Sequence, residues 1–235
     1  MLIMRGDRFL TGAVLAATFV AVLILMFMPL FGGLNAFEVA DRLFNSMAKG
    51  SSNYFEDLRT AASERRGSDV QVDIDLKEGT LAGTARTLLS KAGLGVDGDG
   101  TKLKVSGDVS QLAGVIIDDS EAVFYNKGTG TVAKYGQPER ETLFAWWSIL
   151  KEMQKALESK GKFQVAAFLH DVSTKGVEVA YNFYGIEPKE ASKNAAILAG
   201  SLLFYVVYTL WWGYAILCLF DGVGMEMKAG ARKEV

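Results

Sequence analysis

Glycines and acids in the middle of the chain resemble the loops that hold nucleotides and metal ions. The sequence GLGVDG at 93–98 has the spacing of a dinucleotide-binding loop, whose glycines let a pyrophosphate rest on a helix N-terminus. That loop needs a strand before it and a helix after it. Here the apolar pattern predicts a helix that stops at Gly93 and a strand that begins at Leu94, so we expect no nucleotide to bind.

The segment DGDG at 97–100 resembles the start of a calcium loop. An EF-hand loop supplies oxygen ligands at alternate positions over about twelve residues and ends in a bidentate Glu. Thr101, Leu103 and Asp108 stand where such ligands are required. Because Asp-Gly pairs are also typical of tight hairpin turns, we expect a turn without a metal ion.

The other titratable residues have no partners for catalysis that the sequence can place beside them. Asp118, Asp119 and Glu121 share one predicted helix, and a metal site would need His or acids from other elements. We predict a solvated acidic face there. His170 is the only histidine and Cys218 the only cysteine. A structural or surface role is predicted for His170, and we expect no catalytic residue, metal ion or cofactor.

Two adjacent tryptophans, Trp146 and Trp147, are the candidate contact residues of the central domain. Indole rings suit half-exposed positions against a partner, a hydrophobic ligand or a bilayer surface. Packing in the domain core is the alternative. Adjacent positions on a helix diverge by about 100°, so at least one of the two rings is expected to be exposed.

Two long uncharged stretches lie near the ends of the chain, at 10–31 and 197–220. A helix over the second would be about 36 Å long, enough to cross a hydrocarbon core of about 30 Å. The first stretch could instead be a signal peptide. It exceeds the usual apolar region of about 7 to 15 residues and lacks an A-x-A site after Pro29, so we predict that it is retained as a membrane span.

Each predicted span has a face that suits contact with another helix. Small residues allow close approach in the first, and hydroxyl and aromatic groups call for a hydrogen-bonding neighbour in the second. The candidate packing residues are Gly12, Ala13, Ala16, Ala17 and Ala21, with Tyr205, Tyr208, Thr209, Trp212 and Gly213. Either the two spans pair with each other or they pack into a larger complex.

Charge sets the expected orientation and excludes one class of partner. The chain has 235 residues and a formal net charge of −2, so no basic surface for nucleic acid is implied. Basic residues flank both spans on their terminal sides, namely Arg5 and Arg8 before the first and Lys228, Arg232 and Lys233 after the second. By the positive-inside rule both termini are expected to be cytoplasmic. The central domain is then extracytoplasmic, in the periplasm of a bacterium whose inner membrane holds both spans.

The predicted fold class is an α+β membrane protein with an N-terminal and a C-terminal transmembrane helix. Apolar residues alternate from Val70 to Leu76, recur at helical spacing from Leu81 to Ala92, and alternate again on either side of the turn at 97–100, which predicts a β-α-β-β unit. The expected organisation is a tail at 1–9, a span at 10–31, a helical stalk at 32–68, the α+β unit at 69–126, a helical region at 127–196, a span at 197–220 and a tail at 221–235.

Four local features are also expected. A capping box should start a helix at Asn53, and the glycine-rich stretch 126–138 should form a loop. A long helix should run from Glu139 to Lys160. A helix beginning near Glu187 should continue without a break into the second span.

The predicted function is that of a non-enzymatic accessory or structural subunit of a larger membrane protein complex, whose domain contacts other subunits. The alternative is a homo-oligomeric scaffold or ligand-binding sensor that acts alone. Its layout would be similar in outline to that of polysaccharide co-polymerases, although their second span is proline-rich and this one has no proline. The lipid bilayer is a partner in both cases.

Overall fold

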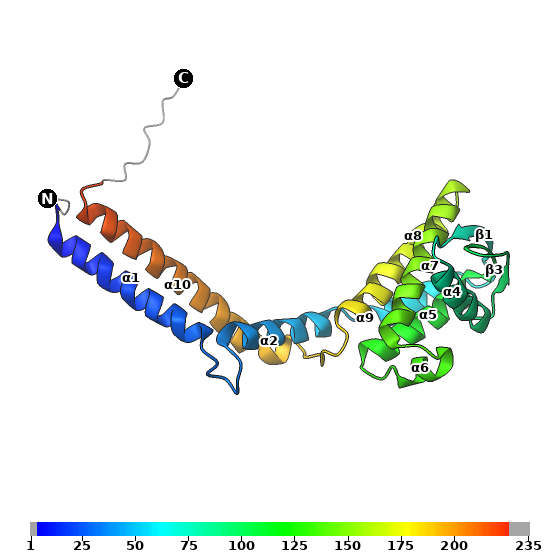
Figure 1. Ribbon diagram of the computed structural model, residues 1–235, viewed down its shortest axis with the longest axis horizontal. Coiled ribbons are helices and arrows are strands. Elements are labelled where there is room, and N and C mark those ends of the chain that lie inside the picture. Colours follow the sequence, from blue (N-terminus) through cyan, green and yellow to red (C-terminus); the bar gives the residue numbers. More distant parts are fainter. Residues whose placement is uncertain (1–3, 226–235) are drawn as a thin grey trace, which may run out of the picture. The chain divides into compact units, whose positions relative to one another are not determined.

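The computed structural model describes residues 4–225 and divides the chain into two compact units (Figure 1). One unit combines the chain up to residue 44 with the chain from residue 191 onward, and the other is residues 45–190. The described chain is mostly helical with one small three-stranded sheet, which confirms the coarse α+β class. The predicted basic tail residues Lys228, Arg232 and Lys233 lie outside the described residues.

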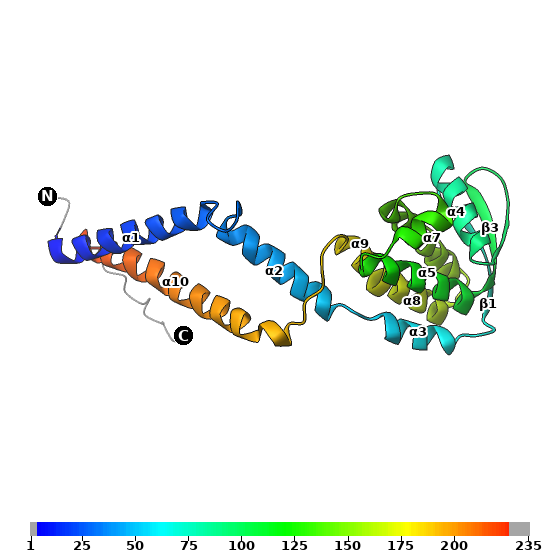
Figure 2. The same ribbon diagram turned by 90° about the horizontal axis from the view of Figure 1, so that it is seen from below.

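Two apolar helices form the core of the first unit. Helix α1 (Gly6–Phe27) and helix α10 (Ala195–Gly222) are both long and apolar enough to cross a membrane. They run antiparallel, because the backbone N–H of Met4 donates to the carbonyl of Gly222 at 2.9 Å (Figures 1 and 2). Helix α1 ends just before Met28 and Pro29, since a residue that precedes proline disfavours the helical conformation.

Helix α2 (Ala36–Ser51) begins at a capping box that sequence reasoning placed elsewhere. Asn35 and Glu38 exchange hydrogen bonds between side chain and backbone, at 2.8 and 2.9 Å. The expected box at Asn53 and Glu56 is absent from helix α3 (Phe55–Ser63), and that prediction was wrong. The Asn53 amide nitrogen donates instead to the hydroxyl of Tyr125, at 2.8 Å.

The three strands confirm the predicted β-α-β-β order. Strand β1 (Asp69–Asp75), helix α4 (Gly79–Lys91), strand β2 (Gly95–Asp97) and strand β3 (Lys102–Asp108) follow one another, and the antiparallel sheet has the order β1-β3-β2. Alternate residues of β1 are buried on a single face, which helices α4, α5 and α7 cover. Helix α5 (Val109–Phe124) starts at a side-chain cap, where Asp108 accepts from the N–H of Gln111 at 3.0 Å.

The stretch expected to be a loop contains a short helix, α6 (Thr129–Tyr135). Its glycines hide any periodicity, but Thr131 and Tyr135 are buried and hold it against the core. The helix ends at Gly136, whose φ of 73° suits glycine. The long helix that follows, α7 (Glu139–Ser159), confirms the prediction and supplies much of the core with its buried Leu143, Trp146, Leu150 and Met153.

A π-helical turn joins the last two helices of the unit. Helix α8 (Phe163–Asp171) passes through a π turn, η1 (Val172–Val177), directly into helix α9 (Glu178–Asn182). The chain then leaves helical geometry until the short 3₁₀ helix η2 (Ser192–Asn194) that precedes α10. The expected continuous helix from Glu187 into the second span was therefore wrong. Gly185 has a φ of 77°, and hydrogen bonds to other elements hold the segment that follows α9.

Candidate functional site

The two apolar helices pack through a seam that only partly matches the predicted faces. Gly12 is buried, and a Cβ atom at this position would lie 2.7 Å from the backbone nitrogen of Leu219. Only glycine, which lacks a Cβ atom, therefore allows this close approach of α1 to α10. Phe19 is also buried, and its ring lies 4.1 Å from that of Tyr208 and 4.6 Å from that of Trp212. Ala13 and Ala16 are half-buried beside this seam.

Several predicted packing residues point away from the seam. On α1, Ala17 and Ala21 are exposed, and on α10 Tyr205, Thr209 and Gly213 are exposed. Trp212 is 39% exposed, but its ring packs on Phe19 in the seam. The prediction followed an i, i+4 stripe, whereas the observed seam on α10 follows alternating steps of three and four residues. This is the heptad spacing of paired helices, and it would have identified the seam residues Tyr208, Trp211, Ala215, Cys218 and Gly222. Trp211, which sequence reasoning missed, donates from its indole nitrogen to the carbonyl of Leu15 at 3.1 Å.

Polar groups near the middle of α10 differ in how they are satisfied. The hydroxyls of Ser201 and Thr209 bond back to carbonyls one turn earlier in their own helix, at 2.8 and 2.7 Å. The hydroxyl of Tyr208 is buried and has no hydrogen-bond partner within residues 4–225. Tyr205 is 65% exposed on the outer surface of the helix pair. The pair thus encloses the Tyr208 hydroxyl without a partner and leaves Tyr205 on its outer surface.

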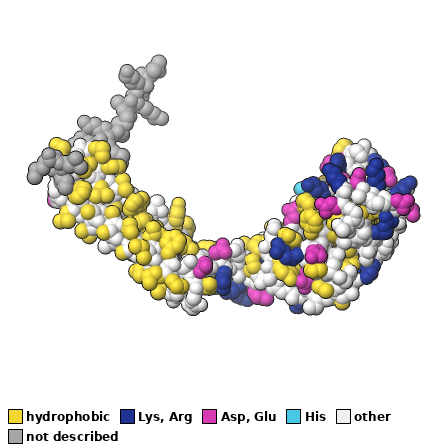
Figure 3. Space-filling view, in the orientation of Figure 1, with side chains coloured by type: hydrophobic (Ala, Val, Ile, Leu, Met, Phe, Trp, Pro, Cys, Tyr) yellow, Lys and Arg dark blue, Asp and Glu magenta, His cyan; other side chains and the backbone are white. Residues whose placement is uncertain are grey.

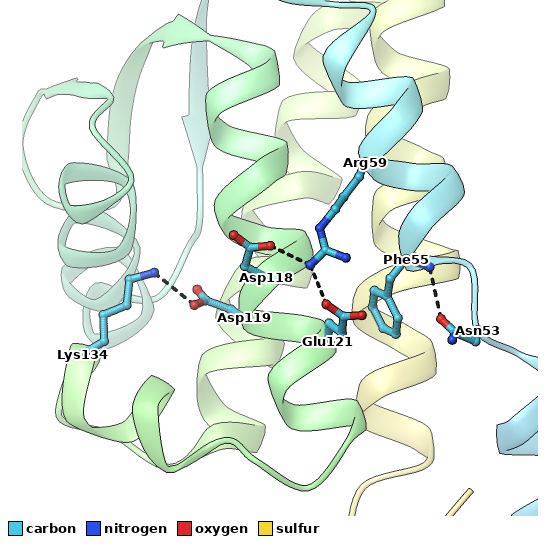
Figure 4. Close-up of polar contacts among 7 residues, drawn as sticks. All are labelled: Asn53, Phe55, Arg59, Asp118, Asp119, Glu121 and Lys134. Carbon is cyan, nitrogen blue, oxygen red and sulfur yellow. Dashed lines mark hydrogen bonds and ion pairs between the residues drawn. The ribbon is translucent and has the colours of Figure 1, made fainter. Parts of the chain in front are cut away.

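Contrary to the prediction, the acidic cluster on α5 does not form one solvated face. Asp118 and Glu121 both accept hydrogen bonds from the Arg59 guanidinium of α3, at 2.8 and 2.5 Å, whereas Asp119 points to the other side of the helix (Figure 4). Asp119 is 5% exposed, so the prediction was wrong for this residue. Adjacent helix positions diverge by about 100°, and this turn carries Asp119 into the core.

Three side chains compensate the burial of the Asp119 carboxylate. One oxygen accepts from the hydroxyl of Tyr135 at 2.7 Å and from the indole nitrogen of Trp146 at 3.0 Å. The other oxygen pairs with the Lys134 ammonium at 3.0 Å. Burial, together with the hydrogen bond to Asp119, raises the pKa of Tyr135 above its ordinary value. The group therefore links α5, α6 and α7 as a structural centre.

The two tryptophans lie in different environments. Trp146 is fully buried at Asp119, so the core alternative holds for it and a partner cannot reach its ring. Trp147 is half-buried and donates from its indole nitrogen to the Glu178 carboxylate at 2.8 Å. It lines a pocket of about 330 Å³ between α7 and α9. Trp147 is thus the member of the pair that can contact a ligand.

A buried lysine that sequence reasoning did not identify holds the segment that follows α9. Lys49 near the end of α2 is fully buried, and its ammonium donates to the carbonyl of Phe183 at 3.0 Å and to that of Ile186. The ammonium also lies 4.8 Å from the centre of the Phe124 ring. Burial lowers the pKa of Lys49. Its only sequence signal was a lysine among the apolar positions of an amphipathic helix.

The motif-like segments take the structures that their sequence context predicted. A helix precedes GLGVDG and strand β2 begins at Gly95, so the strand-loop-helix order of a dinucleotide site is absent there. The DGDG segment forms the turn between β2 and β3. His170 lies on the exposed surface of α8.

The pocket of about 330 Å³ beside Trp147 offers space for a small ligand. Within residues 4–225, no three His, Cys, Asp or Glu side chains converge as a metal site would require. The paired helices offer a surface for lipid or for further helices. No protein-family model, no curated protein and no solved structure matches this chain.

Proposed function

We propose that α1 and α10 anchor the chain in the inner membrane of a bacterium and that the chain serves as a non-enzymatic subunit of a larger membrane protein complex. Residues 45–190 then form an extracytoplasmic domain that contacts other subunits, and both termini are cytoplasmic. This proposal rests above all on the surface of the helix pair. Lipid would cover its exposed apolar side chains, and a further helix would supply a hydrogen-bond partner for its exposed tyrosine hydroxyl.

The outer surface of the helix pair is apolar. Leu202, Leu203 and Leu210 of α10 are each about two-thirds exposed, at 66%, 65% and 67%. Figure 3 shows hydrophobic side chains over α1 and α10, whereas charged side chains gather over residues 45–190. Transfer of such apolar surface from water to hydrocarbon is favourable by about 25 cal/mol per Å². Both helices are also long enough to span the bilayer, which supports anchoring at each end of the domain.

Labelling of single cysteines tests the orientation. In a Cys218→Ala background, Lys155→Cys would place a thiol on the exposed surface of α7, and Met4→Cys would place one before α1. We expect a membrane-impermeant maleimide to label position 155 in cells whose outer membrane has been made permeable, and position 4 only after the inner membrane is opened. Labelling of both positions before that step, or of position 4 alone, would contradict the proposed orientation.

An outward-facing tyrosine near the middle of α10 supports a further helix in the assembly. A phenol in hydrocarbon is costly without a hydrogen-bond partner. Tyr205 faces outward, and the buried hydroxyl of Tyr208 has no partner among the described residues. A neighbouring helix with carbonyl, hydroxyl or amide acceptors would satisfy the hydroxyl of Tyr205. The carboxylates of Asp118, Asp119 and Glu121 already serve structural contacts, which supports a role without catalysis.

Native mass measurement after mild detergent extraction tests the subunit role. We expect different membrane proteins to co-purify with the chain, and the variant Tyr205→Phe to retain about threefold less of them, because an interhelical hydrogen bond contributes about 0.6 kcal/mol. Tyr214→Phe, nearer the helix end, is the matched control and should retain them fully. A homo-oligomer without other chains would favour the stand-alone scaffold or sensor instead.

A further inference from the structure

The pocket beside Trp147 has aromatic walls and one acid. Phe144 and Trp147 of α7 and Tyr181 of α9 supply three rings, and Leu143 and Val177 supply aliphatic surface. Glu178 is the only charged residue of the lining. The volume of about 330 Å³ lies within the range of small-molecule pockets.

The π turn before α9 explains how this acid and the third ring reach the pocket. A π turn adds one residue to a helical turn, and such insertions are frequent at functional sites. Here η1 ends at Val177, so Glu178 is the first residue after the turn and Tyr181 lies one helical turn later in α9. Gly176 within the turn is buried against Leu58, which holds the turn on the core. The side of α9 that lines the pocket is therefore set by rigid neighbours.

The charge of Glu178 is only partly compensated. The carboxylate accepts a hydrogen bond from the Trp147 indole at 2.8 Å, and within residues 4–225 it forms no ion pair with a basic side chain. A half-buried carboxylate among apolar groups is more stable when a cation lies beside it. Aromatic ring faces attract the same kind of group, because their quadrupole is negative above the ring.

The neighbouring basic residues leave the cavity itself open. The Lys151 ammonium lies 4.7 Å from the Trp147 ring centre, and the Arg140 guanidinium lies 4.4 Å from that of Tyr181. Both contacts show that these rings already attract cations. Neither basic residue is part of the pocket lining.

We propose that this pocket binds a small organic cation, with an ammonium group beside Glu178 and an apolar body against the rings of Phe144, Trp147 and Tyr181. The ammonium would supply the missing positive charge, and the hydrocarbon part would displace water from the aliphatic wall at Leu143 and Val177. This site is independent of the proposed complex, because its groups all come from one domain.

Fluorine NMR of the full chain labelled with 5-fluorotryptophan tests this site, with benzyltrimethylammonium as the probe. The protein is kept in dodecyl maltoside, whose uncharged headgroup cannot compete as phosphatidylcholine would. We expect a saturable shift of the Trp147 resonance, assigned with Trp147→Phe, and no such shift with the anion phenylacetate. Glu178→Gln should weaken binding at least tenfold, whereas Glu158→Gln on the exposed end of α7 should leave it unchanged.

The buried Trp146 resonance serves as the check that each variant is folded. A Trp147 resonance that does not move, or that moves equally with phenylacetate, would overturn the proposal. So would unchanged affinity in Glu178→Gln when its Trp146 resonance keeps the native position. If Glu178→Gln loses that position, the more conservative Glu178→Asp decides the question, because it keeps the charge and should keep binding within a few-fold.

Discussion

Replacement of Asp119 by alanine is expected to lower the free energy of unfolding of the 45–190 unit by about 3–5 kcal/mol. The carboxylate is buried, and its removal leaves two buried donors, the Trp146 indole N–H and the Tyr135 hydroxyl, without an acceptor. Each unsatisfied donor costs about 1–3 kcal/mol. Urea unfolding of the full chain in detergent, followed by near-ultraviolet circular dichroism, measures the loss.

The neighbouring Asp118 offers a matched control. Its side chain is 68% exposed and pairs with Arg59 at the surface, so Asp118→Ala should cost less than about 1 kcal/mol. Asp119→Asn should fall between the two, because the amide oxygen still accepts hydrogen bonds. Equal losses in Asp118→Ala and Asp119→Ala would show that the buried centre contributes no more than a surface ion pair.

The contrast between these two adjacent acids shows what a sequence can predict. The strands were predictable because Val70, Val72 and Ile74 alternate with polar residues, and one buried face of a sheet imposes that period. The burial of Asp119 was not predictable, because its three partners come from α6 and α7, and α6 has no periodicity of its own. A carboxylate can be buried only where hydrogen-bond donors from other elements meet it, and those donors lie elsewhere in the sequence.

The pair of apolar helices and the pocket also depend on contacts that the sequence does not reveal. The lengths of α1 and α10 follow from uncharged runs, but the seam between them depends on which residues meet, so Trp211 was missed and Tyr205 lies outside the seam. The pocket depends on a π turn, and no residue in Val172–Val177 marks such an insertion. Sequence reasoning singled out Trp147 but could not place Glu178 beside it.

Lys49→Ala is expected to destabilise the 45–190 unit by about 2–4 kcal/mol, because it leaves a cavity and removes the charged donor that the carbonyls of Phe183 and Ile186 share. The exposed Lys155→Ala should change stability by less than about 0.5 kcal/mol. Urea unfolding at neutral pH, with the same detergent, measures both. A loss no larger than that of Lys155→Ala would mean that the segment after α9 does not need its lysine.

The destabilisation by Lys49→Ala should also grow with pH. Burial lowers the pKa of Lys49 below the 10.5 expected in the unfolded chain, so between the lowered value and about pH 10.5 the unfolded state binds more protons than the folded state. The unfolding free energy of the unsubstituted chain therefore rises with pH across this window relative to that of Lys49→Ala. Tyr135, whose pKa is raised, contributes an opposite slope above pH 10, but it is present in both proteins and cancels in the difference. The difference in unfolding free energy between the unsubstituted chain and Lys49→Ala could instead stay flat or fall as the pH approaches 10.5. That result would show that the Lys49 ammonium keeps an ordinary pKa, because only a lowered pKa makes the folded state gain stability on deprotonation.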